Sequence, residues 1–207
     1  MKAKRGKVLP SNNFSWRFAK KEDYVMEFDW HYHPEYEICL TLNSIGSKHV
    51  GDHINHYDHP HLVLLGTNLP HSWHAKALDS TKPQTVYIIQ IPAIWLEKQI
   101  ANNPELNILE NMLKLSLRGL EFSSETTENA ITLFEEMNQA DPIEHYILLI
   151  KLFNLMAKDN SSKALASNFY VFGNKTDISV PKLDKVIKYI YKNFTQTLNA
   201  DELAALA

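Results

Sequence analysis

The sequence has little cysteine, no long apolar run and no excess of positive charge, and each shortage excludes a class of protein. Its single cysteine, Cys39, cannot form an internal disulfide, and its place in an apolar run is typical of a buried thiol in a reducing compartment. No apolar run approaches the roughly 18 residues of a membrane span, and no apolar core follows the basic residues 1–10, as a secretory signal would require. The net charge of -3 gives the whole chain no attraction for a polyanion. We therefore expect a cytoplasmic protein without a membrane partner, in which any nucleic-acid contact needs a local basic face.

The composition is that of a globular protein, with 44% apolar and 22% charged residues in a chain of 207. This length suits one domain of ordinary size and a smaller second one. Residues 14–92 show short alternating or apolar runs bounded by turn residues. The expected strands cover residues 14–18, 24–28, 36–42, 61–65 and 85–91. Short strands at this spacing indicate a sandwich or a barrel.

After Pro92 the apolar residues recur with a helical period. We expect helices over residues 93–102, 104–117, 124–140 and 143–158, with Pro104 starting the second and Ser124 capping the third. The fourth helix is apolar on nearly every side, so it must be covered on nearly every side. It is therefore either the centre of the helical layer or half of a subunit interface, and the sequence does not choose between these.

Residues 159–180 are polar and have the composition of a linker, although apolar residues at 164–166 and 169–172 keep part of it docked. Pro181 then begins a strongly amphipathic helix whose lysines are expected on a solvated face. Asn199 and Glu202 have the spacing of a capping box that starts one more helix, and the sequence ends soon afterwards at Ala207. We expect that the sequence is cut inside a domain.

Nine of the ten histidines lie within residues 30–75. In an uninterrupted strand His31, His33 and Glu37 share one face, with Pro34 expected to bend the geometry, and a barrel can bring His71 opposite them. Such a set accepts zinc, iron or manganese and leaves coordination positions open for water or a ligand. The alternative is that these polar groups bind a ligand by hydrogen bonds or only satisfy one another.

The other residues of this segment are weaker candidates. His74 has the opposite parity to His71 and is expected to face away from it. Trp30 and Trp73 flank the histidines, so stacking on a ligand and ordinary core packing are both open for them. The remaining histidines border turn residues and are expected in exposed loop or strand positions: His49, His53, His56, His59 and His61.

Two segments resemble the motifs of a known family. The spacing H-x-H-x3-E of His31, His33 and Glu37, followed by Gly46, is similar to the first cupin motif with a longer gap before the glycine. The segment GTNLPH that ends at His71 is similar to the second motif, without the glycine and asparagine of the enzymes. These departures are found in the sensory domains of AraC-type transcription regulators. The resemblance continues at Pro104 and Glu105, at residues 118–122 and 165–167, and over residues 183–207, which resemble the start of the family's helix-turn-helix domain.

The resemblance implies an α+β fold, in which a jelly-roll-like, cupin-type β-barrel is followed by a helical segment and the first helices of a truncated helix-turn-helix domain. The implied divisions are an N-terminal arm at 1–13, an effector-binding barrel at 14–92, a helical dimerisation segment at 93–158, a linker at 159–180 and the start of the DNA-binding domain at 181–207. Because the recognition helix of a helix-turn-helix is absent, DNA binding is expected only of the full-length protein.

The implied function is a ligand-responsive transcription regulator and not an enzyme. Its effector would be a small molecule, with a carbohydrate as the leading class, and it would pair as a homodimer through the helical segment. The implied ligand-binding residues are His31, His33, Glu37, His71, Trp30 and Trp73, of which the first four could hold one divalent metal ion (zinc, iron, manganese or nickel). The competing function is a metal-dependent cupin oxygenase or isomerase. A purely structural dimer module is disfavoured, because buried polar groups cost free energy unless they are satisfied or used.

Overall fold

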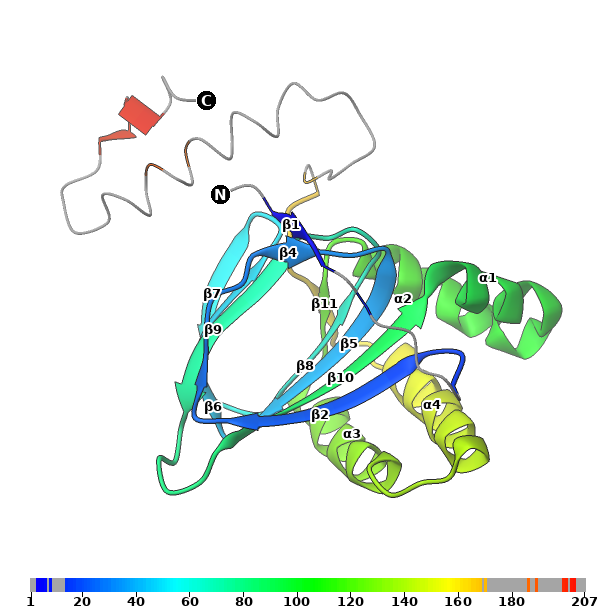
Figure 1. Ribbon diagram of the computed structural model, residues 1–207. Coiled ribbons are helices and arrows are strands. Elements are labelled where there is room, and N and C mark those ends of the chain that lie inside the picture. Colours follow the sequence, from blue (N-terminus) through cyan, green and yellow to red (C-terminus); the bar gives the residue numbers. More distant parts are fainter. Residues whose placement is uncertain are drawn as a thin grey trace.

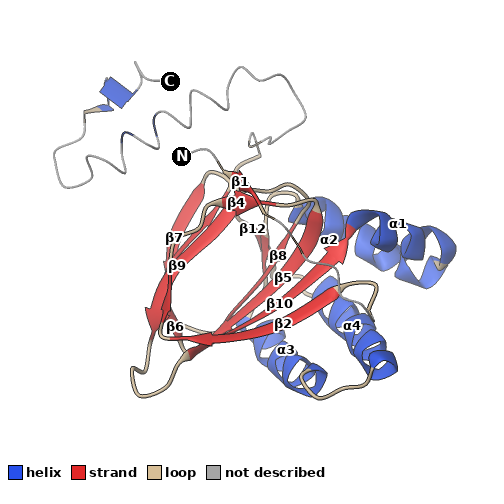
Figure 2. Ribbon diagram, in the orientation of Figure 1, coloured by secondary structure: helices blue, strands red, loops and turns tan. Residues whose placement is uncertain are grey.

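The computed structural model describes residues 3–6, 8, 14–168 and 170, and a few single positions beyond (186, 189, 199, 200, 202 and 203). These residues form a mixed α+β fold with two six-stranded sheets and four α-helices (Figures 1 and 2). The predicted helix from Pro181 and the capping box at Asn199 lie outside the described residues, apart from those single positions. In the described part of the chain, no helix is long and apolar enough to cross a membrane.

The first sheet, called sheet A, has the strand order β1-β4-β9-β6-β7, and β3 also pairs with β9. Its pairs are antiparallel except β1 with β4, which run parallel. Its strands are β1 (Lys4–Arg5), β3 (Val25–Met26), β4 (His31–Tyr32), β6 (Ser44–Val50), β7 (His53–Tyr57) and β9 (His71–Ala77).

The second sheet, called sheet B, has the order β12-β11-β8-β5-β10-β2 and is antiparallel throughout. Two of its strands lie outside the predicted barrel segment: β11 lies in the segment predicted to be helical (93–158), and β12 lies in the predicted linker (159–180). Its strands are β2 (Arg17–Asp23), β5 (Glu35–Leu42), β8 (His61–Leu65), β10 (Gln84–Pro92), β11 (Leu120–Glu121) and β12 (Lys163–Ala164). The start of the predicted linker is therefore docked on the sheet, as its apolar residues indicate, and Ala166 is fully buried there.

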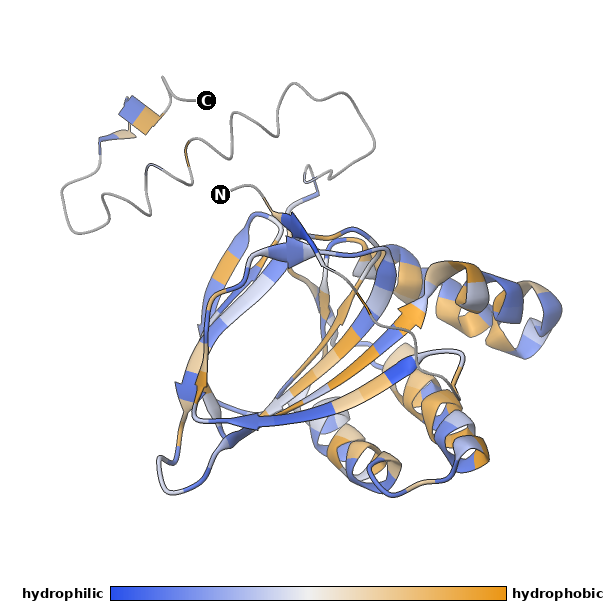
Figure 3. Cartoon of the chain, in the orientation of Figure 1, coloured by the Kyte–Doolittle hydropathy of each residue, from blue (hydrophilic) through white to orange (hydrophobic). Residues whose placement is uncertain are grey.

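The helices pack on the outer face of sheet B (Figure 1). They are α1 (Ala93–Asn102), α2 (Leu109–Ser116), α3 (Ser124–Met137) and α4 (Pro142–Ala157), with a 3-10 turn, η1 (Pro104–Ile108), before α2. Alternate residues of β5, β8 and β10 face these helices and form the larger apolar core, and the other residues face sheet A and form a smaller one. Figure 3 shows hydrophobic positions concentrated on these central strands and on the helices.

Three predicted helices differ in detail from the structure. The expected helix over 104–117 begins with a 3-10 turn, because Leu106 donates its N–H to the carbonyl of Asn103 only three residues earlier. The third ends at Met137 instead of residue 140. The fourth begins one residue earlier than predicted, because Asp141 and Glu144 form a capping box before Pro142.

Helix α4 packs one face into the larger core, through Leu149, Leu152 and Phe153 among others. The structure therefore supports its position in the helical layer. Its N-terminal half keeps apolar side chains in solvent, including Ile143 at 73% exposure and Ile147 at 48%.

The cap of α3 is Ser123 and not the predicted Ser124. Ser123 has an extended backbone, with φ -63° and ψ 160°, and its Oγ accepts a hydrogen bond from the N–H of Thr126. We expect Ser123→Ala to lower the free energy of unfolding by about 1 kcal/mol, because it leaves an N-terminal helix donor without its partner. Urea unfolding of this variant beside Ser124→Ala checks the assignment. Equal losses in both variants would contradict it.

Candidate functional site

Three of the four predicted metal ligands lie together at one end of sheet A. His31 in β4 pairs directly with His71 of the later strand β9, so these two are neighbours in one sheet. The strand that was to carry His31, His33 and Glu37 is interrupted at residues 33–34, and Glu37 belongs to β5 of sheet B. The bend expected at Pro34 therefore moves the chain from one sheet to the other.

The rings of His31, His33 and His71 form a compact group. One nitrogen of each lies within 4.8 Å of the others, and the ring centroids are 4.4 Å (His31 to His71), 5.1 Å (His33 to His71) and 5.8 Å (His31 to His33) apart. His33 and His71 are only 3% and 2% exposed, and His31 is half-buried. Three imidazoles at this separation can close on a single ion.

Each of these rings has one nitrogen fixed by a hydrogen-bond acceptor. His31 and His71 donate from Nδ1 to the backbone carbonyls of Asp29 and Leu69, both at 2.7 Å, because a carbonyl can only accept. His33 donates from Nε2 to the carboxylate of Glu37 at 3.0 Å. In the neutral rings the opposite nitrogens carry the lone pairs, and those of His33 (Nδ1) and His71 (Nε2) are buried without a hydrogen-bond partner. Metal-ligating histidines are oriented in this way, so the donor set fits a divalent metal ion.

Glu37, the fourth predicted metal ligand, orients the ring of His33. It does not belong to the group whose ligand atoms lie within 4.8 Å of one another. Its Oε2 accepts hydrogen bonds from His33 and from Gln90 (2.8 Å), and its Oε1 lies 3.8 Å from Nε2 of His71. Gln90 is held in turn by Arg17, whose guanidinium donates to Oε1 of Gln90 at 3.1 Å. Burial alone would raise the pKa of Glu37, but the hydrogen bond from His33 and the nearby imidazoles lower it to about 2.

The pKa values of the two buried histidines are shifted in opposite directions. Burial lowers the pKa of His71 to about 4, so its ring is neutral and able to bind a metal at neutral pH. Burial also opposes the charge of His33, but the carboxylates of Glu37 and Glu35 outweigh it and raise its pKa.

Glu35 is a residue of this site that the sequence reasoning missed. Its Oε2 lies 3.4 Å from Nδ1 of His33 and is buried without a hydrogen-bond partner. A signal was available, because Glu35 has the same strand parity as His33 and Glu37. Its carboxylate therefore offers, besides that of Glu37, a second possible oxygen ligand for a metal ion next to the three imidazoles.

The two predicted tryptophans have different surroundings. Trp73 contacts the ring of His71 at 5.9 Å, and its Nε1 is buried without a partner, so a ligand acceptor could reach it. Trp30 is also buried, and it stacks on Phe28 at 6.3 Å. His74, next to Trp73, is exposed and faces away from His71, as its parity predicts.

The N-terminal arm lies on the histidine group. Strand β1 pairs with β4, and Gly6 donates its N–H to the carbonyl of Tyr32 at 2.8 Å. A Cβ atom on Gly6 would lie 3.1 Å from Cδ2 of His31 and 3.8 Å from Cδ2 of His33. The absence of a side chain at Gly6 therefore allows the arm to approach both rings closely.

A second polar cluster joins the two sheets away from these histidines. Lys48 in β6 is 2% exposed, and its Nζ donates to Oε1 of Glu121 and lies 2.7 Å from Nε2 of His61, which itself lies 2.7 Å from the same carboxylate oxygen. His61 was predicted to be exposed, but its partners in this cluster allow it to be buried in β8. Burial lowers the pKa of Lys48 and of His61, more than the carboxylate of Glu121 raises them. No sequence pattern indicates this cluster, because Lys48 and Glu121 are 73 residues apart.

Comparisons with known proteins give matches of structure only. No family model matches the sequence, and no curated protein matches it. The structure is similar to that of unsaturated-fatty-acid-bound ToxT from Vibrio cholerae strain SCE256, with a TM-score of 0.50 and 13% identity over 95% of this chain and 70% of that one. Two further matches are ToxT from Vibrio cholerae in its P21 crystal form (TM-score 0.47, 12% identity, 92% and 70% covered) and the AraC-like transcriptional activator CuxR (0.42, 6%, 84% and 57%). The likeness at TM-score 0.50 concerns the fold alone.

Proposed function

We propose that this chain is the sensory part of an AraC-type, ligand-responsive transcription regulator, in which the two sheets form a cupin-type barrel. The observation that carries the proposal is the contact between the buried histidine group and the N-terminal arm. A ligand that binds these rings must disturb or strengthen the contact with Gly6. The site is thereby connected to strand β1, whose pairing with β4 a bound ligand would weaken or strengthen.

The ligand would reach the histidines directly or through a metal ion. His31, His33 and His71 would hold a zinc, iron, manganese or nickel ion, with Glu35 or Glu37 as an additional oxygen donor. Such an ion would supply open coordination positions for the oxygen atoms of an effector. Trp73 would offer its unpaired Nε1–H to the same effector.

The effector class is a narrower proposal. A carbohydrate follows from the family resemblance of the sequence. ToxT, whose fold this chain shares, has been determined with an unsaturated fatty acid bound, so carboxylic acids belong in the same screen.

The mechanism is a shift between two arrangements of the arm and the barrel. A ligand biases this equilibrium only by its difference in affinity for the two arrangements, and a few kcal/mol of difference is sufficient. In the full-length protein that bias would change the spacing of two DNA-binding domains.

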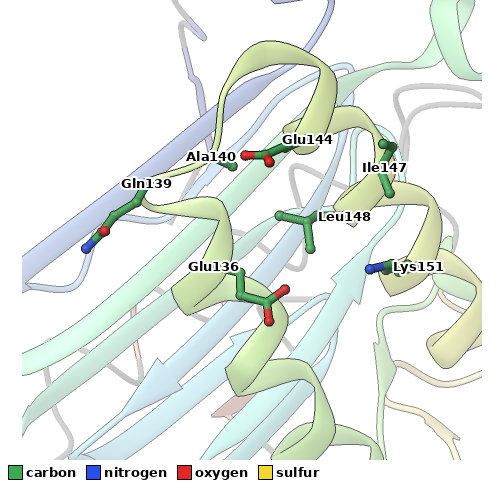
Figure 4. Close-up of a pocket in the computed structure, with 7 residues that line it drawn as sticks. All are labelled: Glu136, Gln139, Ala140, Glu144, Ile147, Leu148 and Lys151. Carbon is green, nitrogen blue, oxygen red and sulfur yellow. The ribbon is translucent and has the colours of Figure 1, made fainter.

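Pairing of two subunits is proposed through the helical layer. The exposed Ile143 and Ile147 lie on α4, and Ile147 also lines an open pocket of roughly 460 Å³ between α3 and α4 (Figure 4). Glu136, Glu144 and Lys151 border this pocket, so apolar contact would be flanked by charges that can fix the orientation of a partner.

Calorimetric titration with sugars, sugar acids and unsaturated fatty acids tests the proposed function. We expect one class to bind the wild-type protein and to lose at least about tenfold in affinity in His33→Ala. The control variant His59→Ala removes an exposed histidine and should bind normally. An effector whose affinity is the same in His33→Ala would contradict the proposed site, and turnover of the bound compound would favour the metal-dependent enzyme.

A further inference from the structure

The outward face of sheet A carries three histidines that the proposed effector site does not use. Along β6 the side chains alternate, so that Lys48 and Val50 are buried between the sheets while Ser47 and His49 lie on the outer face. His56 in β7 and His74 in β9 lie on the same outer face and are exposed. These three imidazoles come from three adjacent strands.

The strand register places the three histidines around one serine. Ser47 pairs with His56 on one side and with His74 on the other, and His49 follows Ser47 by two residues on the same strand. Side chains of directly opposite residues begin about 5 Å apart, and diagonal neighbours are about 7–8 Å apart. His49 is diagonal to both His56 and His74, so an ion above Ser47 is within reach of all three rings.

Three contacts support this arrangement. Nε2 of His49 lies 3.3 Å from the hydroxyl of Ser47, which shows that this ring leans toward the centre of the group. Phe28 packs edge-on against the ring of His49 at 4.9 Å and limits its movement. His56 donates from Nδ1 to the backbone carbonyl of Gly46 at 3.2 Å, so its Nε2 carries the lone pair.

We propose that His49, His56 and His74 form a second metal site, on the outer face of sheet A, for a divalent ion of the nickel, copper or zinc class. Imidazole nitrogen is the preferred donor of these ions, and hard ions such as magnesium require oxygen donors. Among the described residues, His31, His33 and His71 are the group whose ligand atoms lie within 4.8 Å of one another, so the outer three do not have that separation as they stand. The proposed site would close when the ring of His56 leaves the carbonyl of Gly46 and turns, with the exposed ring of His74, toward His49. This inference is independent of the proposed function and of the inner group.

Nickel binding to the untagged full chain tests the outer site. Equilibrium dialysis against nickel, followed by metal analysis, would be made on the wild type, on His74→Ala and on the control His59→Ala. Both substitutions are at exposed positions and leave the core intact. We expect His74→Ala to bind one nickel ion fewer per chain, or to bind it at least about tenfold more weakly. His59→Ala should match the wild type.

A second pair of variants separates the outer site from the inner one. His31→Ala should leave the nickel that depends on His74 in place, and His56→Ala should remove it as His74→Ala does. Nickel content that is unchanged in His74→Ala and His56→Ala would overturn the proposal. An equal loss in His59→Ala would also overturn it, because binding would then depend on the number of histidines and not on this group.

Discussion

Replacing Glu121 with glutamine is expected to lower the free energy of unfolding by about 3 kcal/mol, because it leaves the charge of Lys48 buried without a counter-charge. Removal of one partner from a buried ion pair typically costs about 3–5 kcal/mol, and the lower end applies here because the carboxylate of Glu121 is 25% exposed. Urea unfolding at neutral pH measures the loss. Glu125→Gln, an exposed substitution in the first turn of α3, is the matched control and should change stability little.

The double variant Lys48→Met with Glu121→Leu distinguishes the cost of an unpaired charge from the value of the pair itself. Replacing both members of a buried pair by apolar residues is often neutral or stabilising. We expect the double variant to recover part of the stability that Glu121→Gln loses, and not all of it, because Nε2 of the buried His61 loses both of its partners. A double variant as unstable as the single one would show that Lys48 and Glu121 are not coupled as the structure places them.

Acid is expected to destabilise the wild-type protein more than Glu121→Gln. Burial alone would raise the pKa of Glu121, but hydrogen bonds from His61 and Lys48 outweigh it and lower the pKa to about 2, against 4.5 for an ordinary glutamate. Because the folded state favours the ionised form, Glu121 contributes fully to the free energy of unfolding above pH 4.5, and this contribution is lost as the pH falls toward 2. The contribution of Glu121 is about 3 kcal/mol before allowance for solvent screening, and about 2 kcal/mol after it.

The measurement is the free energy of unfolding by urea at pH 6, 4.5 and 3, for wild type and Glu121→Gln. The difference between the two proteins should shrink as the pH falls, since protonation removes the same charge that the substitution removes. A difference that stays constant down to pH 3 would contradict the low pKa of Glu121.

Periodicity and parity predicted the helices, the central strands β5, β8 and β10 and part of the site, but they gave no bounds for β6, β7 and β9, and the strand expected at 14–18 is β2 at Arg17–Asp23. The helical period placed α1 at its observed bounds, and alternation put His31 and His33 on one face because a short strand preserves parity even when Pro34 ends it. The sequence could not predict that Glu37 would orient His33, since this depends on the path of the chain from one sheet to the other.

Other features depend on register and on backbone angles that the sequence leaves open. Ser123 and Ser124 are equally good caps by residue type, and only the extended backbone of Ser123 selects it. Lys48 sits between two outward residues, so a slip of one residue would have exposed it, and the pairing of β6 with β9 decides that it is buried.

Metal analysis of the untagged protein tests the central claim most directly, namely that His31, His33 and His71 form a metal-holding sensor site. It is best made on His74→Ala, so that the outer histidines contribute nothing, with and without the further change His31→Ala. We predict near-stoichiometric divalent metal in the first protein and its loss in the second. Metal that is retained after His31→Ala, or absent from both proteins, would contradict a metal site in this histidine group.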